Sequence, residues 1–185
     1  MLRQELQFQN VELQNLDLSE FIALQNLGGS SCSSYTDLIK QGEGLRNKMY
    51  YDTMGIPTCC YGYNLKNGNA RSQVSKAGGN YDSIMAGQAI SQSVCNNLLD
   101  FEIAVSKKDK QALFGGLKCK AADDVAVDMT YNMGYGTMSQ FKRFIGSMKA
   151  GNWAEAKSNG QASAWCGQVG SRCSRNMNQI VNCCK

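Results

Sequence analysis

The sequence contains no histidine and only one proline among its 185 residues. Without histidine, a zinc site built from cysteine and histidine is excluded, and no Cys-x-x-Cys pair offers the usual spacing for a thiolate site. A single proline beside nineteen glycines also argues against collagen-like chains and proline-rich disordered chains. We therefore expect a globular protein without a metal ion.

Long hydrophobic runs are missing as well. No stretch approaches the roughly 18 unbroken apolar residues that cross a bilayer, so we expect no membrane partner. Hydrophobic residues make up 43% and charged residues 18% of the chain, which suits one compact domain or two small lobes sharing a core. The net charge of +4 suits an anionic polymer, but the basic residues are scattered and form no nucleic-acid-binding motif. We expect no nucleic-acid partner.

Cysteine, by contrast, is plentiful. So many cysteines in a modest chain predict disulfides and an oxidising compartment, hence a secreted protein or one of a lysosomal or digestive compartment. Two pairs are sequence neighbours, which are too close to bridge comfortably, so each of these residues is expected to pair elsewhere. Nine is an odd number, so one thiol is left over or pairs between chains. The nine are Cys32, Cys59, Cys60, Cys95, Cys119, Cys166, Cys173, Cys183 and Cys184.

The N-terminal segment differs in composition from the rest. Residues 1–27 are rich in Gln, Asn and Glu and lack the apolar centre of a signal peptide. Their apolar positions alternate in part like a strand and are spaced in part like a helix, so both types stay open. Either a signal peptide has been removed, or the segment is a pro-piece or an extension. With the small-residue linker that comes after it, we predict an extension over residues 1–34 and one domain over 35–185.

Periodicity predicts mainly helices with one small sheet. Ser34 and Asp37 resemble a capping box, which predicts a helix from about Thr36 to Lys48. Short Tyr-, Cys- and Thr-containing runs separated by glycines predict a small antiparallel sheet between Tyr50 and about Arg71. Helical spacing returns in five further stretches: about 86–106, 121–133, 139–149, 153–158 and 172–182.

Two carboxylates stand out at the junction of the first helix and the sheet. Glu43 is expected in the last part of the helix, Asp52 in the turn entering the sheet, and Thr58 on the first strand. A helix that leads straight into a hairpin can bring these side chains to one cleft wall. Two carboxylates facing one space, one in an apolar and one in a polar setting, are what glycoside hydrolysis requires. An acid pair taken alone is more often solvated surface charge.

The surrounding residues resemble the signature of phage-type lysozymes, glycoside hydrolase family twenty-four, and closely resemble its T-even phage branch. The matching positions of the first block are Glu43-Gly44, Arg46, Lys48, Tyr50, Asp52-Thr53, Gly55, Thr58 and Gly62. A second block consists of Asn132-Met133-Gly134, Phe141, Trp153, Trp165, Gln168, Arg172 and Arg175. The resemblance spans about 36–180. It implies an α+β, mainly helical fold with an N-terminal lobe at about 35–85 that holds the sheet, a connecting helix at about 86–106 and a helical C-terminal lobe at about 107–185.

The resemblance also implies roles for individual residues. Glu43 is similar to the catalytic acid, Asp52 to the carboxylate that activates water on the opposite sugar face, and Thr58 to the residue that holds this water. The family inverts configuration, which implies carboxyl groups about 6.5–9.5 Å apart. Arg172 is similar to the arginine that meets the acid across the cleft, and the expected sugar contacts are Asn64, Tyr131 and Asn132.

Carried over as a whole, the resemblance implies a monomeric lysozyme that needs no cofactor. Its expected substrate is bacterial peptidoglycan, cleaved at the β-1,4 bond between N-acetylmuramic acid and N-acetylglucosamine. Two alternatives come from other classes: a catalytically weak relative that only binds peptidoglycan, and a cationic protein that acts on membranes. The intact Glu43, Asp52 and Thr58 argue against the first, and the absence of a strongly basic amphipathic helix argues against the second.

The strand after the acid pair departs from the family pattern. Where the family has Thr-Ile-Gly-x-Gly-His, this chain has Thr58-Cys-Cys-Tyr-Gly-Tyr63. Cys60 replaces a glycine, which bears on the local backbone geometry, although a disulfide from Cys59 or Cys60 would make the strand rigid. Tyr63 replaces a histidine and so removes an ion-pair partner. We interpret Tyr50, Trp153 and Trp165 as core anchors rather than sugar platforms.

Overall fold

The computed structural model describes residues 32–184. The chain divides at Cys32, and the unit Ser33–Lys185 contains the sheet and the helices of the described residues. Our predictions for residues 1–27 lie outside the described residues.

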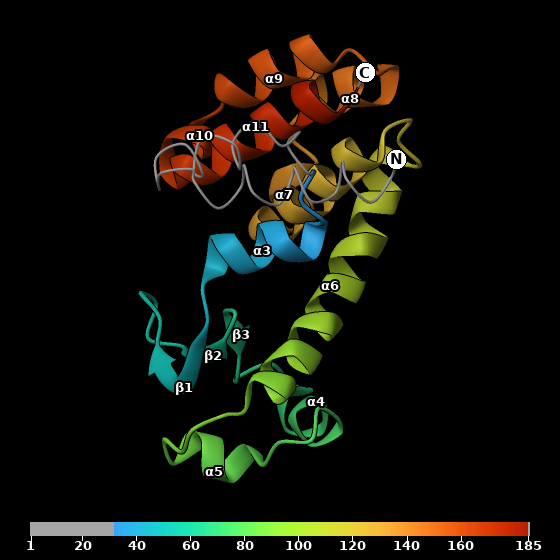
Figure 1. Ribbon diagram of the computed structural model, residues 1–185. Helices are drawn as coiled ribbons and strands as arrows, with labels where there is room; N and C mark the ends of the chain where they lie inside the picture. The colour runs from blue at the N-terminus through green and yellow to red at the C-terminus, as the bar shows by residue number, and fades with distance from the viewer. Residues whose placement is uncertain (1–31, 185) are drawn as a thin grey trace, which may run out of the picture. The chain divides into compact units, whose positions relative to one another are not determined.

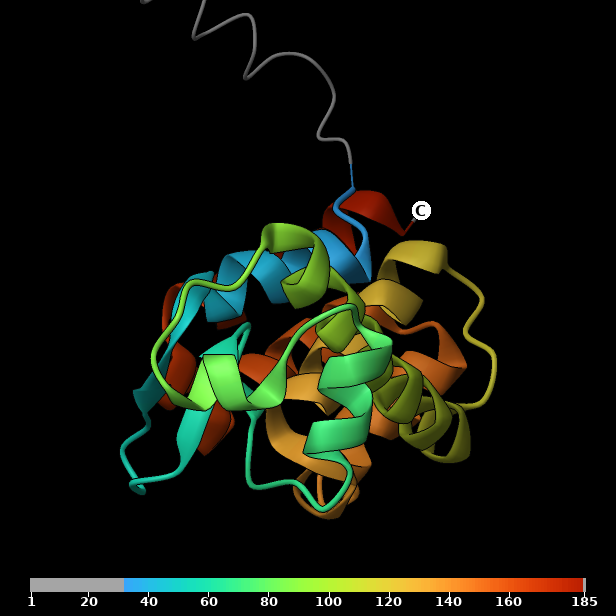
Figure 2. The same cartoon turned by 90° about the horizontal axis from the view of Figure 1, so that it is seen from below.

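The described chain is mainly helical with one small sheet, which confirms the predicted α+β class. Its elements in chain order are α3 (Tyr35–Glu43), β1 (Arg46–Tyr51), β2 (Pro57–Cys60), β3 (Tyr63–Asn64), α4 (Ala70–Lys76), α5 (Tyr81–Met85), α6 (Gln92–Phe114), α7 (Lys120–Met138), α8 (Lys142–Ala150), α9 (Trp153–Gln161), α10 (Ala164–Val169) and α11 (Ser171–Cys183). The sheet, α4 and α5 lie at one end of the long helix α6, and α7 to α11 gather toward the other end (Figure 1). Seen from below, the sheet, α4 and α5 lie in front of the C-terminal helices (Figure 2).

Two buried apolar clusters correspond to the two ends of α6. One surrounds the sheet and includes Leu98 and Ile103 of α6, and the other lies among the C-terminal helices and includes Phe114 at the end of α6. Helix α3 also contributes to both clusters, because Leu38 belongs to one and its neighbour Ile39 to the other. We call each cluster with the elements around it a lobe, the N-terminal lobe around the sheet and the C-terminal lobe among α7 to α11. The helix that carries Glu43 is therefore packed between the two lobes.

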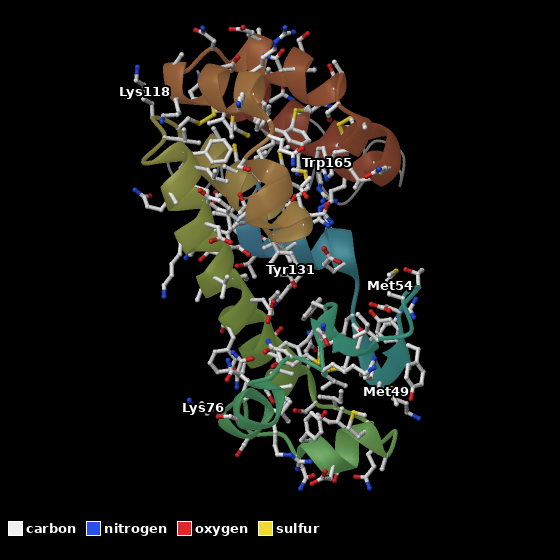
Figure 3. The ribbon with its side chains drawn as sticks, turned by 180° about the vertical axis from the view of Figure 1, so that it is seen from behind. Met49, Met54, Lys76, Lys118, Tyr131 and Trp165 are labelled. Atoms are coloured by element: carbon white, nitrogen blue, oxygen red, sulfur yellow. A yellow bond between two sulfur atoms is a disulfide. The ribbon has the colours of Figure 1, made fainter. Side chains whose placement is uncertain are left out.

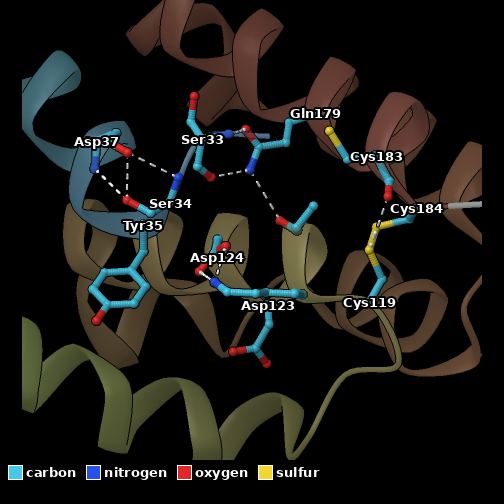
Figure 4. Close-up of polar contacts among 12 residues, drawn as sticks. Ser33, Ser34, Tyr35, Asp37, Cys119, Asp123, Asp124, Gln179, Cys183 and Cys184 are labelled. Atoms are coloured by element: carbon cyan, nitrogen blue, oxygen red, sulfur yellow. Dashed lines mark hydrogen bonds and ion pairs between the residues drawn. A yellow bond between two sulfur atoms is a disulfide. The ribbon is translucent and has the colours of Figure 1, made fainter. Parts of the chain in front are cut away.

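Helix α3 begins as predicted but ends early. The Ser34 hydroxyl accepts a hydrogen bond from the Asp37 backbone N–H, and the Asp37 carboxylate accepts one from the Ser34 N–H (Figure 4), so the capping box is confirmed. The predicted end at Lys48 is wrong, because Gly44 leaves the helix at φ 69° and the chain continues as strand β1. The polar sequence of β1 has no strand-like alternation, since much of it is exposed.

The sheet has the antiparallel order β1-β2-β3. It begins at Arg46 and ends at Asn64, earlier at both ends than the predicted Tyr50 to Arg71. The predicted positions of two residues change as a result. Asp52 lies in the turn between β1 and β2 rather than at the entrance to the sheet, and Thr58 lies on the second strand rather than the first. Arg71, the predicted end of the sheet, belongs instead to helix α4.

The helix boundaries follow caps and breaks that periodicity alone did not reveal. Helix α6 begins after the N-cap Ser91 and ends at Gly115 with φ 68°, so it starts and ends later than the predicted 86–106. The polar run after Ser106 resembles a loop, yet Ser106, Lys110 and Phe114 continue a buried face at a spacing of four. Among residues 32–184, no helix is long and apolar enough to cross a membrane.

Disulfides connect distant parts of the chain. The described bonds are Cys60–Cys95, Cys119–Cys184 and Cys166–Cys173, and Cys32 and Cys183 are disulfide-bonded as well. None of the described bonds joins sequence neighbours, as predicted, and Cys60–Cys95 fixes strand β2 to helix α6. The remaining thiol, that of Cys59, is free and buried.

Candidate active site

Glu43 lies at the end of α3, where the two lobes meet. Its Oε1 accepts a hydrogen bond of 2.7 Å from Nη1 of Arg172 on α11. The Glu43 side chain is 24% exposed, whereas that of Arg172 is 6% exposed. A Cβ placed on Gly62 would lie 3.7 Å from Glu43 Oε2, so the β2–β3 turn also comes close to this carboxylate. The Glu43 carboxylate is therefore partly exposed to solvent, while its arginine partner is buried.

A second carboxylate holds the other side of Arg172. Asp128, on α7, is fully buried and accepts hydrogen bonds from Arg172 Nε at 3.1 Å and Nη2 at 2.7 Å. Asn176 donates to the same carboxylate at 2.6 Å. Burial lowers the pKa of Arg172, but the hydrogen bonds and charges of Asp128 and Glu43 outweigh burial and raise it. The guanidinium thus joins α3, α7 and α11 as a fixed cation.

Asp52 is held by the turn that contains it. Its Oδ1 accepts hydrogen bonds of 2.8 Å from the backbone N–H groups of Met54 and Ile56. The turn is closed by hydrogen bonds from the Asp52 N–H to the Ile56 carbonyl and from the Gly55 N–H to the Asp52 carbonyl, each 3.0 Å. Two backbone donors on one oxygen orient the carboxylate without using a second charged side chain.

Thr58 lies in a row that crosses the sheet. Residues Tyr50, Thr58 and Asn64 are direct cross-strand partners, so their side chains share one face. The Thr58 hydroxyl donates a hydrogen bond of 3.0 Å to the Ile56 carbonyl. Because its hydrogen is used in this bond, the hydroxyl oxygen acts toward a further partner as an acceptor.

The charge of Glu43 acts on two tyrosines, one of which, Tyr50, lies on this face. Burial raises the pKa of Tyr50, and among the smaller effects the charges of both Glu43 and Asp52 raise it as well. Both carboxylates therefore act on one phenol. Tyr131, on α7, donates a hydrogen bond of 3.0 Å from its hydroxyl to the Tyr61 carbonyl, and Figure 3 shows it between α7 and the sheet. Burial raises the pKa of Tyr131, and the Glu43 charge adds to this effect.

A cavity of about 230 Å³ is lined by Glu43, Asn132 and Arg172. Asn132 Oδ1 accepts a hydrogen bond of 2.7 Å from Trp165 Nε1. The tryptophan is 5% exposed, in agreement with our interpretation of it as a core anchor, whereas Tyr50 and Trp153 are partly buried. A separate hollow of about 730 Å³ is lined by Trp165 together with Met133, Phe141 and Phe144.

The structure thus brings the predicted residues together in two groups. Glu43, Arg172 and Asn132 line one cavity. Thr58 and Asn64 share one face of the sheet, and Asp52 lies in the turn between β1 and β2. The predicted separation of 6.5–9.5 Å between the carboxyl groups stays a prediction, as do the catalytic and sugar-binding roles.

Sequence reasoning missed Asp128 and Asn176. The signal for Asp128 was present, since it is an acid between the buried residues Val127 and Met129 in an otherwise apolar helix turn. A buried acid in such a position requires a partner, and the partner here lies 44 residues away in the chain.

Two comparisons with known proteins match most of this chain. The model of the phage lysozyme family matches residues 40–178. The pre-baseplate central spike protein Gp5 of Enterobacteria phage T4 is 27% identical over 153 residues, which cover 77% of this chain. The match covers 26% of that relative, so this chain spans about a quarter of its length. Since the family model covers most of the chain, including Glu43, Asp52, Thr58 and Arg172, this protein belongs to the phage lysozyme family.

Proposed function

We propose that this chain is a lysozyme that hydrolyses the β-1,4 bonds between N-acetylmuramic acid and N-acetylglucosamine in bacterial peptidoglycan. The observation that carries the proposal is the partly exposed Glu43, paired at 2.7 Å with the buried Arg172 where the two lobes meet. Asp52 supplies the second carboxylate from the β1–β2 turn. Membership of the phage lysozyme family supports glycoside hydrolase activity.

The proposed reaction is a single displacement with inversion. Glu43, protonated before the reaction, gives its proton to the glycosidic oxygen as the bond to the anomeric carbon breaks. Asp52 accepts a proton from a water molecule that attacks the anomeric carbon from the opposite face. Thr58 accepts a hydrogen bond from this water, because its own hydrogen is donated to the Ile56 carbonyl.

The hydrogen bonds of the expected sugar-binding residues suggest how each would act. The Oδ1 atoms of Asn132 and Asn64 already accept hydrogen bonds, from Trp165 and from the Lys66 N–H. Each asparagine therefore offers its NH₂ group to a substrate carbonyl or hydroxyl. The Tyr131 hydroxyl is engaged with the Tyr61 carbonyl, so Tyr131 is proposed to shape the site between the lobes.

We further propose that the protein works as a monomer in an oxidising compartment, secreted or digestive, where it acts in antibacterial defence or in the digestion of bacteria. The disulfides support such a compartment, because thiols stay reduced in the cytosol. A net charge of +4 favours association with an anionic cell wall.

The test compares clearing of a peptidoglycan suspension by the wild type, Glu43→Gln and Asp52→Asn. We expect both variants to lose at least about a hundredfold in rate, because each loses the group that gives or accepts a proton. Asp100→Asn makes the same chemical change at an exposed position of α6 and should leave the rate unchanged. If the wild type sediments with peptidoglycan but releases no reducing sugar, the binding alternative replaces hydrolysis.

Product stereochemistry tests the mechanism separately. In a proton NMR time course with a soluble β-linked peptidoglycan fragment, the first product should be the α-anomer. An initial β-anomer would mean that configuration is retained, and it would overturn the role proposed for Asp52.

A further inference from the structure

Arg172 is shared by two carboxylates of opposite surroundings. Glu43 is partly exposed at the lobe junction, whereas Asp128 is fully buried. Each lies within 2.7 Å of the guanidinium through a different nitrogen, Nη1 for Glu43 and Nη2 for Asp128. The side chain of Arg172 itself is 6% exposed, so its charge is stabilised mainly by these partners.

This arrangement bears on whether Glu43 can hold a proton. A buried guanidinium paired with one carboxylate strongly favours the ionised form of that carboxylate, because protonation would leave the cation without compensation. Here the Arg172–Asp128 pair is already neutral as a unit. Protonation of Glu43 therefore leaves a compensated ion pair behind it and no isolated buried charge.

The other groups near the pair do not replace this compensation. Arg172 from α11 is hydrogen-bonded to Glu43, and Arg175 lines the same cavity. The Glu43 charge also acts on Tyr131 from α7 and Tyr50 from β1. Burial raises the pKa of both tyrosines, so they stay neutral wherever a carboxylic acid titrates.

Apart from its two carboxylate partners, Arg172 has a neutral and a cationic neighbour on its own helix. Asn176 is neutral, and Arg175, whose Nη2 donates to the Leu38 carbonyl, adds a second positive charge to the same region. Among residues 32–184, the acids that form ion pairs with Arg172 are Glu43 and Asp128.

We propose that Asp128 is a positioning residue for the catalytic acid: it neutralises and orients Arg172, so that Glu43 keeps its ion-pair partner and still accepts the proton that catalysis requires. The inference rests on the proposed function of Glu43. It predicts that the charge of Asp128, and not only its hydrogen bonds, sets the pH range of activity.

The decisive variant is Asp128→Asn, which keeps the size and one acceptor oxygen but removes the charge. Arg172 is then compensated by Glu43 alone, so Glu43 releases its proton at lower pH. We expect the alkaline limb of the pH–activity profile to move down by about 1 pH unit, with about a tenfold loss of rate above that limb and a much smaller loss well below it. The titration of the Glu43 carboxyl carbon, followed by NMR, should move in the same direction.

Asp124→Asn is the matched control. Asp124 lies one turn earlier on α7, is also buried and is paired with Lys120 rather than with a residue of the site. Its amide variant should leave the limb in place. A uniform loss of activity at all pH values in Asp128→Asn, without movement of the limb or of the Glu43 titration, would show a merely structural role and overturn the proposal.

Two further outcomes are separable. If the Glu43 titration moves in Asp128→Asn but the wild type hydrolyses no peptidoglycan, the coupling stands and the proposed function fails. If Asp128→Asn does not fold, the wild type decides the question by NMR. As Glu43 is protonated, the Arg172 Nε–H signal must persist and Asp128 must not titrate with it. Loss of the Arg172 signal or joint titration of the two acids would overturn the coupling.

Discussion

Gly42 determines how closely Arg172 approaches helix α3. A Cβ at this position would lie 2.7 Å from the Arg172 Cζ and Nη1 atoms, closer than carbon atoms approach in proteins. Alanine favours a helix over glycine by up to about 1 kcal/mol, but here the guanidinium would have to move away from two carboxylates. We expect Gly42→Ala to lower the free energy of unfolding by about 1–3 kcal/mol and to reduce lytic activity, as measured by urea denaturation and turbidity clearing.

Gly146 provides the control for this substitution. It lies inside α8, and a Cβ there would meet no atom within 4 Å. Gly146→Ala should therefore stabilise the protein by up to about 1 kcal/mol. Equal stability changes in the two variants would mean that Arg172 relaxes without loss, and the close packing assigned to Gly42 would then be wrong.

Cys60 combines a strained backbone with a disulfide. Among residues 32–184, Cys60 is the one non-glycine residue with a positive φ, at 57°. It occupies a position where the resemblance described above has glycine. Such a conformation costs an L-residue about 1–2 kcal/mol. The disulfide bond to Cys95 holds the Cys60 backbone in this conformation. We expect the double variant Cys60→Gly/Cys95→Ala to be more stable than Cys60→Ala/Cys95→Ala by about 1 kcal/mol in thermal unfolding.

Both double variants lose the disulfide, so the comparison isolates the backbone. Each should be less stable than the wild type by about 2–4 kcal/mol, since the unfolded chain gains the freedom of an open loop. If the alanine variant is as stable as the glycine variant, the left-handed backbone is not required at residue 60.

At the scale of elements, helix α7 is divided by Gly134. This glycine has φ 70° and ψ 165°, so the regular helix stops at Met133 and a second segment continues to Met138. We expect Gly134→Ala to cost about 1–2 kcal/mol, because alanine disfavours positive φ. Gly136→Ala, two residues later, meets no atom within 4 Å and has no positive φ, so it should be neutral or slightly stabilising. Chemical denaturation that ranks the two in the opposite order would contradict this account of the break.

The same helix shows which elements a sequence predicts. The end of the regular part of α7 agrees with the predicted 121–133, since apolar spacing stops at Gly134. The boundary between α3 and β1 was missed, because an exposed polar strand has no alternation to distinguish it from a continuing helix. The short helices α4, α5 and α10 span too few turns for periodicity to detect.

At the scale of the whole molecule, the site residues that local sequence patterns predict are those that lie close together in the chain. Glu43, Asp52 and Thr58 lie within one sequence block, and motif spacing was sufficient to select them. Asp128 was missed because its role depends on contact with Arg172 on α11, 44 residues along the chain. Pairings between lobes depend on how the two clusters pack around α6, which no local pattern contains.

The stability of the whole molecule in alkali depends on buried groups that hold their protons. Burial raises the pKa of the Cys59 thiol from 9.0 to about 12 and that of Tyr63 from 10.0 to about 12. The unfolded chain loses these protons near their ordinary values, whereas the folded chain keeps them until about pH 12. Deprotonation therefore favours unfolding, and the stability present below pH 9 is lost as the pH rises toward 12.

Thermal and urea unfolding at pH 7 to 11 measure this loss, and Cys59→Ala separates the contribution of the thiol. Between pH 9 and 10 the wild type should lose up to about 1.4 kcal/mol per pH unit from Cys59 alone, because one more proton is bound in the folded state. Cys59→Ala, less stable at neutral pH because of the smaller side chain, should show little loss in this interval and begin its decline nearer pH 10, where the tyrosines titrate in the unfolded chain. Parallel curves for the two proteins would show that the buried thiol does not couple folding to alkaline pH.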